Sequence, residues 1–380
     1  MLSQNRKRIP CTIMRGGTSR GVYMLENYLP KEENERDALL LKLMGSPDVR
    51  QINGLGGAAS VTSKVAIVGV SERPDADVDY TFAQVAVDKP VVSYKGNCGN
   101  ISSGVGPFAI EQGLVKITEP VTSVRIYNTN TDKIIVEEVQ VEQGAVKYHG
   151  DFSIAGVAGT GAPIKLKFVN PAGSISGRLL PTGNAVDVLE VPDLGALEVS
   201  IVDAANPLVF VRAKDIGLTG KECPAELDAD EEKLALLEKV RGLAAVKMGL
   251  IEDYKESAWK MPGIPKMTFV AEPEDYVTSG GETVAGDRID LLSRMMSMQK
   301  AHPTYAMTGA MCTAVAAVIP GSIVNQVIRK EADTDFIRIG HAGGVLEAGV
   351  EFHTEEGSVA VESAFGFRTA NLILEGVVFI

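Results

Sequence analysis

The sequence is poor in the residues that build metal centres and thiol-redox sites. Its 380 residues include four cysteines and four histidines, all far apart in the chain. They form no Cys-x-x-Cys pair and no His-Glu-x-x-His motif, so no zinc ribbon, thioredoxin-like centre or zinc protease is predicted. We expect no bound metal, and we interpret the scattered cysteines as free thiols of a cytoplasmic protein.

Long apolar runs and positive charge are also scarce. No segment approaches the roughly 18 uninterrupted apolar residues of a membrane helix, and the first residues lack the apolar core of a signal peptide. With 37 basic and 49 acidic side chains, the net charge is −12. We expect no nucleic-acid partner, because phosphates require a basic surface. An anionic ligand would have to be captured by a local site rather than by the field of the whole protein.

The length of the chain predicts two domains, because single hydrophobic cores stop growing near ~250–300 residues. The 45% hydrophobic content is enough to fill two such cores. A turn-rich stretch at 178–187 is the expected boundary. We therefore expect domains over 1–183 and 184–380, with the last strand free to return to the first domain.

Short β-rich runs, bounded by Gly, Pro, Asn and Asp, dominate the chain. A charged start followed by apolar residues, or apolar residues at helical spacing, predicts a smaller number of helices. Asp228 or Asp230 would cap the second of these helices. The predicted strands are 64–70, 80–87, 123–128, 133–141, 197–203 and 207–213, and the predicted helices are 31–44, 229–248 and 287–300.

Two further segments, 100–112 and 308–319, are rich in small residues and apolar on every side, which is typical of a buried helix. Each has a cysteine near its start, Cys98 in the first case and Cys312 in the second. We therefore predict an α+β fold with two similar halves, each a curved sheet or barrel around a central helix. The chain has no close internal repeat, so this prediction concerns architecture alone.

Cys98 lies in the segment 96–107, where Gly-Asn-Cys-Gly-Asn precedes a predicted helix. Glycine lets the backbone approach a ligand, and the N–H groups at a helix start favour an anion or a thiolate. A buried structural cysteine in a tight turn is the alternative. We expect Cys98 to be catalytic, and the neighbours expected to bind substrate are Asn97, Gly99, Asn100 and Ser102.

Lys64 opens a very apolar strand and follows the glycine-rich stretch 54–57. Burial there would favour the neutral amine, which is the form that acts as a base. The alternative is a lysine that extends its ammonium group into solvent at a strand end. The residues expected to hold a carboxylate beside Lys64 are Gly56, Gly57 and Ser63.

Arg15 and Arg20 flank a short run of glycines and hydroxyls, Gly16, Gly17, Thr18 and Ser19. A guanidinium beside backbone amides and hydroxyls suits a carboxylate. The run is no Walker phosphate loop, because Gly-Lys-Ser/Thr is absent. Candidates from the second half, each with an ordinary structural explanation as well, are Asn206, Thr308, Gly309, Cys312 and His341.

Five segments, in this order, resemble the PrpF-like family, which includes isomerases of methylaconitate and 3-methylitaconate and the 4-oxalomesaconate tautomerase. The segments are MRGGTSRG (14–21), SVTSK (60–64), PDADVDYTFAQV (74–85), GNCGNISSGVGPFAIE (96–111) and TGAMCTAVAAVIPG (308–321).

The resemblance implies a diaminopimelate-epimerase-like fold with the active site in the cleft between two domains. It also implies Lys64 and Cys98 as the catalytic pair and a homo-oligomer. The sequence contains no motif for a redox or carbanion-stabilising cofactor, so we expect none. The segment 205–207 is similar to the Gly-Asn-Pro-His segment of the epimerases, with Leu208 in place of the histidine. Near the end, Ala342 stands at the proline position of the family's His-Pro motif.

We therefore expect a cofactor-independent isomerase that shifts a proton in a small anionic di- or tricarboxylate. The expected outcome is double-bond migration or cis-trans isomerisation of an acid such as 3-methylitaconate, methylaconitate or aconitate. Lys64 is the expected base, and the reverse assignment with Cys98 stays open. Two alternatives also stay open: an amino-acid racemase or epimerase that uses Cys98 and Cys312, and an inert carboxylate-binding accessory protein.

Overall fold

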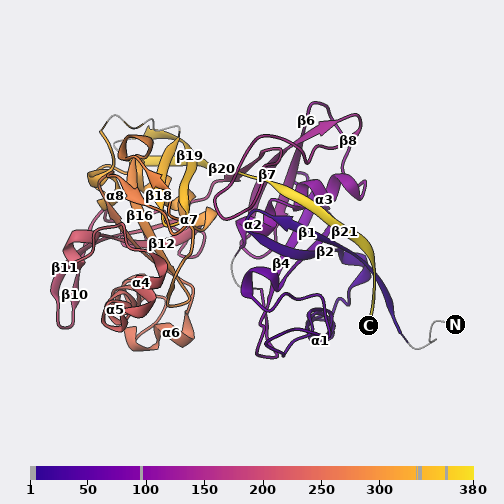
Figure 1. The fold of residues 1–380 in the computed structure, drawn as a ribbon, viewed down its shortest axis with the longest axis horizontal. Helices are drawn as coiled ribbons and strands as arrows, with labels where there is room; N and C mark the ends of the chain where they lie inside the picture. The colour runs from indigo at the N-terminus through magenta and orange to yellow at the C-terminus, as the bar shows by residue number, and fades with distance from the viewer. Residues whose placement is uncertain (1–5, 95–96, 331, 333–335, 356–357) are drawn as a thin grey trace. The chain divides into compact units, whose positions relative to one another are not determined.

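The computed structural model describes residues 6–94, 97–330, 332, 336–355 and 358–380. They form two compact units, Met1–Lys167 with Phe367–Ile380 as unit 1, and Phe168–Gly366 as unit 2. In Figure 1, unit 1 runs from indigo to magenta and includes the final yellow strand. Gly96, the first residue of the predicted Cys98 segment, lies outside the described residues.

Unit 1 is built on a mixed sheet in which seven described strands pair in the order β21, β1, β2, β3, β4, β6 and β7. The β2–β3 and β4–β6 pairs are parallel, and the other pairs are antiparallel. The strands are β1 (Arg8–Gly16), β2 (Ser19–Leu25), β3 (Lys64–Val70), β4 (Val78–Val85), β6 (Val121–Asn128), β7 (Lys133–Glu142) and β21 (Ala370–Phe379), with shorter β5 (Val92–Ser93), β8 (Ala145–Val146) and β9 (Ile164–Val169).

Helices cover both faces of this sheet. On one face, α1 (Glu33–Met44) buries Leu40 and Leu43 against alternate residues of the strands, such as Val65. On the other face lie α2 (Gly99–Ser102) and α3 (Val105–Glu111), whose residues from Val105 to Ile110 are all buried. The segment predicted as one helix over 100–112 is therefore two short helices, with Ser103 and Gly104 between them.

Unit 2 repeats the pattern of strand directions. Its strands pair in the order β10, β11, β12, β13, β16, β18, β19 and β20, and the β12–β13 and β16–β18 pairs are parallel. The strands are β10 (Asp187–Val191), β11 (Gly195–Ala204), β12 (Asn206–Arg212), β13 (Lys266–Ala271), β16 (Leu291–Ser297), β18 (Ile337–His341), β19 (Gly344–Glu355) and β20 (Ser358–Arg368), with shorter β14 (Tyr276–Val277), β15 (Thr283–Val284) and β17 (Lys300–Ala301).

The helices of unit 2 occupy equivalent places in the strand order. Between β12 and β13, α5 (Glu231–Lys247) packs Leu237, Val240 and Ala244 on one face of the sheet, and the side chain of its cap Asp230 accepts a hydrogen bond from the Lys233 N–H. Between β16 and β18, α7 (Met307–Val318) is buried along its whole length. The remaining helices are α4 (Pro224–Ala229), α6 (Ser257–Lys260) and α8 (Ile323–Val327). The predicted α+β architecture of two similar halves is confirmed, and the described pairings of each unit close no barrel.

One helix prediction was wrong. The segment 287–300, predicted as a helix, contains strand β16, which is buried on both faces from Leu291 to Met296. A run of this kind lacks the alternation of a half-exposed strand, so periodicity does not separate it from a helix. The helix predicted over 308–319 is α7, which begins at Met307, so Cys312 lies five residues into it.

Candidate active site

Lys64 is the first residue of β3, and its side chain is held inside unit 1. The residue is only 8% exposed. Its Nζ donates a hydrogen bond of 2.6 Å to Oε1 of Gln84, directly opposite on β4. The same Nζ lies 5.0 Å from the centre of the Phe82 ring. The described partner of the amine is therefore a neutral amide, and no described carboxylate forms an ion pair with it.

The amide of Gln84 is fixed in turn by the chain that leads into β3. Its Nε2 donates to the backbone carbonyls of Ser60 and Ser63, at 3.1 and 2.9 Å. Because both carbonyls accept, the nitrogen must face them and the oxygen must face Lys64. Ser63, a predicted ligand residue, is fully buried, and its hydroxyl donates to the Val85 carbonyl while accepting from Gln51. This network orients the amine of Lys64.

The strand register puts Lys64 on the same face of the sheet as two buried tyrosines. Lys64 is paired with Gly21 on β2 and with Gln84 on β4. Tyr23 lies two residues from Gly21 on β2, and Phe82 and Tyr80 lie two and four residues from Gln84 on β4. Side chains two residues apart share a face. Tyr23 donates to the Ile101 carbonyl of α2 at 2.6 Å. A Cβ atom on Gly21 would lie 2.9 Å from the Ile101 side chain and 3.1 Å from the Lys64 carbonyl.

Cys98 is the residue that precedes α2, and it is half-buried. The pKa values of Tyr23 and Tyr80 are raised well above their usual range, mainly by burial. A negative charge on Cys98 raises both pKa values further. The Cys98 segment thus lies over the face that carries Lys64. However, α2 is a single turn, so the field of a long helix that the sequence predicted for this cysteine is reduced to a few N–H groups.

The β1–β2 hairpin is hydrogen-bonded to the Cys98 segment through Asn100. The Asn100 side chain donates to the Thr18 hydroxyl at 2.9 Å. A Cβ atom on Gly16 would clash with the Asn100 carbonyl, and one on Gly17 would clash with the Asn100 side chain. Gly17 also has a φ of +50°, in the left-handed region. Glycine is therefore required here so that the hairpin can lie against the start of α2.

A fully buried arginine that the sequence did not single out joins this cluster. Nε of Arg368 donates to the side-chain oxygen of Asn100 at 3.1 Å, and Nη1 donates to the Phe367 carbonyl. Desolvation lowers the pKa of Arg368 to about 10. From the hairpin, Nη1 of Arg15 donates to the Gly17 and Thr369 carbonyls, and desolvation also lowers the pKa of Arg15.

The remaining predicted residues of unit 1 lie around the same hairpin. A Cβ atom on Gly57 would lie 2.6 Å from a guanidinium nitrogen of Arg20, and one on Gly56 would clash with the Gln51 side chain. Ser19 is buried. The hydroxyl of Ser102 donates to the Asn97 side chain and to the Cys98 carbonyl, at 3.1 and 3.0 Å. Gly99 is the buried first residue of α2.

The segment 17–21 also fits the Gly-x-Ser-x-Gly pattern of serine hydrolases. That pattern forms a nucleophile elbow only where a strand turns sharply into a helix. Here the segment turns from β1 into β2, and its serine, Ser19, is 4% exposed. The geometry is therefore that of a hairpin and not of a hydrolase elbow.

The other predicted ligand residues belong to unit 2. Asn206 begins β12, while Thr308 and Gly309 are buried in the first turn of α7. A Cβ atom on Gly309 would clash with Met295, so this glycine lets α7 pack on β16. Cys312 is fully buried, its thiol donates to the Val202 carbonyl at 3.3 Å, and burial raises its pKa.

His341 ends β18 and is 1% exposed. Its Nδ1 accepts a hydrogen bond of 3.1 Å from the Gly343 N–H, and its ring lies 6.2 Å from that of Tyr305. An Nδ1 that accepts carries no proton, so in the neutral ring the proton is on Nε2. The surroundings that the structure gives this histidine are those of a core residue of unit 2.

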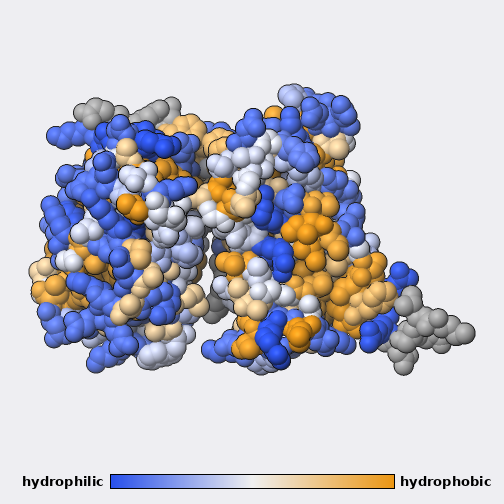
Figure 2. Space-filling model, viewed as in Figure 1, coloured by the Kyte–Doolittle hydropathy of each residue, from blue (hydrophilic) through white to orange (hydrophobic). Residues whose placement is uncertain are grey.

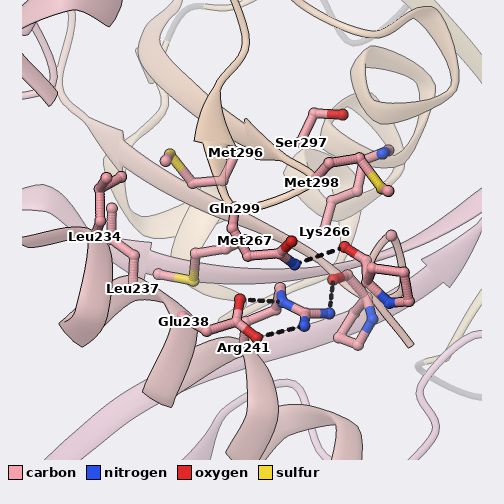
Figure 3. Close-up of a pocket in the computed structure, with 13 residues that line it drawn as sticks. Leu234, Leu237, Glu238, Arg241, Lys266, Met267, Met296, Ser297, Met298 and Gln299 are labelled. Atoms are coloured by element: carbon pink, nitrogen blue, oxygen red, sulfur yellow. Dashed lines mark hydrogen bonds and ion pairs between the residues drawn. The ribbon is translucent and has the colours of Figure 1, made fainter. Parts of the chain in front are cut away.

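A pocket of unit 2 lies apart from every predicted residue (Figure 3). Its walls carry Met267, Met296 and Met298. Its main charged group, Arg241, is already paired with Glu238 at 2.6 Å and donates to the Met261 carbonyl. Because these charges are satisfied internally, the pocket offers no candidate chemistry. Across the part of the chain that the structure describes, no group of three or more His, Cys, Asp or Glu side chains could hold a metal.

Comparison with known proteins gives matches over nearly the whole chain. The chain is 51% identical over 377 residues to the 3-methylitaconate isomerase of Eubacterium barkeri, covering 99% of this chain and 98% of that protein. It is 40% identical over 384 residues to the 2-methyl-aconitate isomerase of Shewanella oneidensis, covering 98% and 96% of the two chains. None of the described helices is long and apolar enough to span a membrane.

Solved structures agree with these matches. A crystal structure of methylitaconate-delta-isomerase superposes with a TM-score of 0.88 at 50% identity, over 99% of this chain and 96% of that chain. A hydroxyproline epimerase from Agrobacterium vitis superposes with a TM-score of 0.55 at 12% identity, over 98% and 93%, and shows the shared fold alone. A sequence model described as PrpF protein matches residues 6–380. With a family match of this extent and relatives at this identity, the chain belongs to the PrpF family and is an isomerase.

Proposed function

We propose that this isomerase shifts a proton within an unsaturated di- or tricarboxylic acid, with 3-methylitaconate as the first acid to test. The 51% identity to a 3-methylitaconate isomerase over 99% of this chain supports that choice. The 40% identity to a 2-methyl-aconitate isomerase supports tricarboxylates as the next class. Both acids have a carbon-bound proton beside a double bond and a carboxylate.

In the proposed reaction, Lys64 as a neutral amine removes the proton from the carbon next to the double bond. The electron pair of that C–H bond moves through the allyl system toward a carboxylate, which gives an enolate-like intermediate. A proton then returns to the far carbon of the allyl system, which moves the double bond. After rotation about the weakened bond, return to the original carbon gives cis-trans isomerisation. Cys98 is the second proton-transfer group, and the two roles are separable by experiment.

The observation that carries this proposal is the setting of Lys64. Its amine is buried, faces the same side of the sheet as the Cys98 segment, and is held at 2.6 Å by a neutral amide. A carboxylate partner would stabilise the ammonium ion and oppose proton uptake from carbon. An amide orients the amine without adding negative charge, so Lys64 can exchange a proton with the substrate.

The test is incubation of the purified protein in D₂O with 3-methylitaconate, methylaconitate and aconitate, followed by proton NMR. We expect loss of the allylic proton signal, with deuterium in the product, for at least one acid. Lys64→Ala should remove this exchange while keeping the thermal unfolding temperature close to that of the parent protein. Exchange at the α-carbon of an amino acid would instead favour the racemase, and binding without any exchange would favour the accessory protein.

We further propose that the protein is a homo-oligomer that associates through the exposed face of β21, and that it works in the cytoplasm. An apolar patch over β1 and β21 is visible in Figure 2. The exposed apolar residues of β21 are Ile373, Leu374, Val377 and Phe379, at 41–51% exposure, and Val377 and Phe379 point to the same face of the strand. Patches of this kind mark association sites. The four free thiols support a reducing compartment.

Light scattering after gel filtration tests the association. We expect a dimer or larger assembly for the parent protein and a monomer for Val377→Lys. The matched control is Val121→Lys, which alters an equally exposed valine on β6, with 41% exposure in both cases. An assembly that survives Val377→Lys, or a parent protein that is monomeric, would contradict the proposal.

A further inference from the structure

We propose that Arg15 and Arg368 form a subsite for one carboxylate of the substrate, and that Arg368 makes the protein selective for di- and tricarboxylates over monocarboxylates. This inference rests on the proposed function, and it assigns a substrate-binding role to an arginine outside every segment that the sequence analysis selected. The subsite takes a carboxylate that remains an anion throughout the reaction. The proton shift itself takes place at carbon, within reach of Lys64 and Cys98.

The two arginines belong to one hydrogen-bonded cluster of unit 1. Arg368 is the last residue of β20, and Thr369 follows it. The Thr369 carbonyl accepts from the Gly17 N–H at 3.0 Å and from the Arg15 guanidinium at 2.9 Å. Arg368 donates to Asn100 at 3.1 Å, and Asn100 donates to Thr18 at 2.9 Å. The hairpin, the start of α2 and the end of β20 are therefore held together around two guanidinium groups.

The positive charge of this cluster has no carboxylate partner in the described part of the chain. Among the residues that the structure describes, no carboxylate forms an ion pair with Arg15 or Arg368, and the hydrogen bonds of both go to carbonyl or amide oxygens. Arg368 is 3% exposed. A buried charge without a counterion is expensive in free energy, and a bound anion would offset that cost. The buried Arg368, with the half-buried Arg15 in the same cluster, therefore indicates a place where an external anion is bound.

Arg294 of unit 2 is a second buried arginine for which the described residues give no ion pair, and its Nη2 has no hydrogen-bond partner among them. It is also 3% exposed, but it donates to three backbone carbonyls, of Glu222, Ser293 and Gly340, at 2.7, 3.0 and 3.3 Å. It also lies 5.4 Å from the centre of the Tyr276 ring. Arg368 has one backbone carbonyl and the oxygen of Asn100. Arg368 differs from Arg294 in its position, because its acceptor Asn100 lies two residues from Cys98 in the chain.

A carboxylate is the ligand class that fits these groups. A guanidinium presents parallel N–H groups that match the two oxygens of a carboxylate, and the pair is strengthened where water is excluded. Asn100 is next to Gly99 and Cys98 in the chain, so an anion held by Arg368 is bound beside the Cys98 segment. A monocarboxylate can fill either this subsite or the reacting position, whereas a dicarboxylate fills both.

The experiment measures binding and turnover separately. Calorimetry with methylsuccinate, a saturated dicarboxylate that has no allylic proton, is compared with butyrate for the parent protein, Arg368→Met and Arg368→Lys. We expect the parent protein to bind methylsuccinate more tightly than butyrate. Arg368→Met should weaken methylsuccinate binding by about 100-fold or more. Arg368→Lys should weaken it by about 10-fold, because lysine keeps the positive charge but not the paired N–H groups of the guanidinium. Butyrate binding should change by less than about threefold.

Two readouts separate this role from a merely structural one. Thermal unfolding of Arg368→Met should occur at the same or a higher temperature, because an unbalanced buried charge is removed. In turnover with the active acid, KM should rise far more than kcat falls. The matched control is Arg294→Met, which removes an equally buried arginine from unit 2 and should leave methylsuccinate affinity within about twofold. If Arg368→Met fails to fold, Arg368→Lys carries the same binding comparison.

Arg368→Met that binds methylsuccinate as tightly as the parent would overturn the inference, and so would an equal loss of affinity in Arg294→Met. The proposed function can fail independently. If the parent shows no deuterium exchange but its methylsuccinate affinity still depends on Arg368, the subsite stands and the isomerase reaction proposed for these acids does not. If exchange occurs normally in Arg368→Met with unchanged KM, the reaction stands and the subsite does not.

Discussion

The two units share one order of strand directions but differ in the residues at equivalent places. Lys64 and Lys266 each open the fourth strand in the order of their unit, and each pairs in parallel with the third residue of the strand before it, Gly21 and Leu208. At the start of the central helix the correspondence ends, because Cys98 precedes α2 and Ala306 precedes α7. The fold is thus carried by apolar patterning common to both halves, whereas the candidate chemistry is concentrated in unit 1.

The largest difference should appear between the two equivalent lysines. Lys64→Ala should reduce kcat/KM by about 10²–10⁴-fold, the usual contribution of a positioned acid or base. Lys266→Ala should change it by less than about threefold. Steady-state kinetics on the active acid measures both, with circular dichroism to confirm folding. Comparable losses in the two variants would show that unit 2 also supplies an acid or base.

The two cysteines of the predicted motifs should differ nearly as much. Cys98→Ser keeps the size of the side chain but replaces a thiol by a far weaker acid, so kcat should fall by about 100-fold or more. Cys312→Ser should retain most of the activity, because this thiol is buried in α7 and donates to the Val202 carbonyl. Equal losses would favour the two-thiol epimerase mechanism over the lysine–cysteine pair.

A smaller change should follow from placing a charge beside Lys64. In Gln84→Glu, a carboxylate 2.6 Å from the amine would favour the ammonium form, which cannot accept a proton. The acidic limb of the pH–kcat/KM profile should therefore move to higher pH by about one unit, with activity recovering in alkaline buffer. Gln84→Met should lower activity without moving that limb, and an unchanged profile in Gln84→Glu would argue against Lys64 as the base.

The smallest predicted effect concerns a carboxyl group beneath the helices of unit 1. Glu137 on β7 is fully buried and accepts a hydrogen bond of 2.8 Å from the Gly106 N–H, whereas the equivalent strand β19 buries Ala348 and Val350. Desolvation raises the pKa of Glu137 well above its usual value. The folded state therefore binds this proton more tightly than the unfolded state.

The sign of the resulting pH dependence follows from this difference. The contribution of protonated Glu137 to stability is complete below its unfolded pKa, near 4.3, and is lost as pH rises toward its folded pKa. Glu137→Gln should remove this loss, so the drop in unfolding free energy between pH 5 and pH 8 should shrink by about 1 kcal/mol or more. Urea unfolding at both pH values measures it, and a drop equal to that of the parent would contradict the assignment.

The strands and helices that could be predicted from the sequence are those set by the spacing of apolar residues and by capping residues within a short segment. Strand β3 and helices α1 and α5 follow from alternation, helical spacing and an aspartate cap, whereas Lys64 and Cys98 were selected as candidates from their neighbours and from the family resemblance. Gln84 and Arg368 were missed for a physical reason. Gln84 reaches Lys64 only through strand register, and Arg368 reaches Asn100 across 268 residues of chain. Neither contact can be predicted from the residue pattern of a short sequence segment.

The pairing of β21 with β1 has a consequence for how the protein is made. Arg8 is opposite Phe379 in that pair. The first strand of unit 1 can therefore complete this pairing only after nearly the last residues have been synthesised. Unit 2 is one continuous segment and is complete earlier in synthesis. Contacts between distant residues form slowly, because a long loop must close first. The second half of the chain is therefore expected to fold before the first half, which holds the candidate active site.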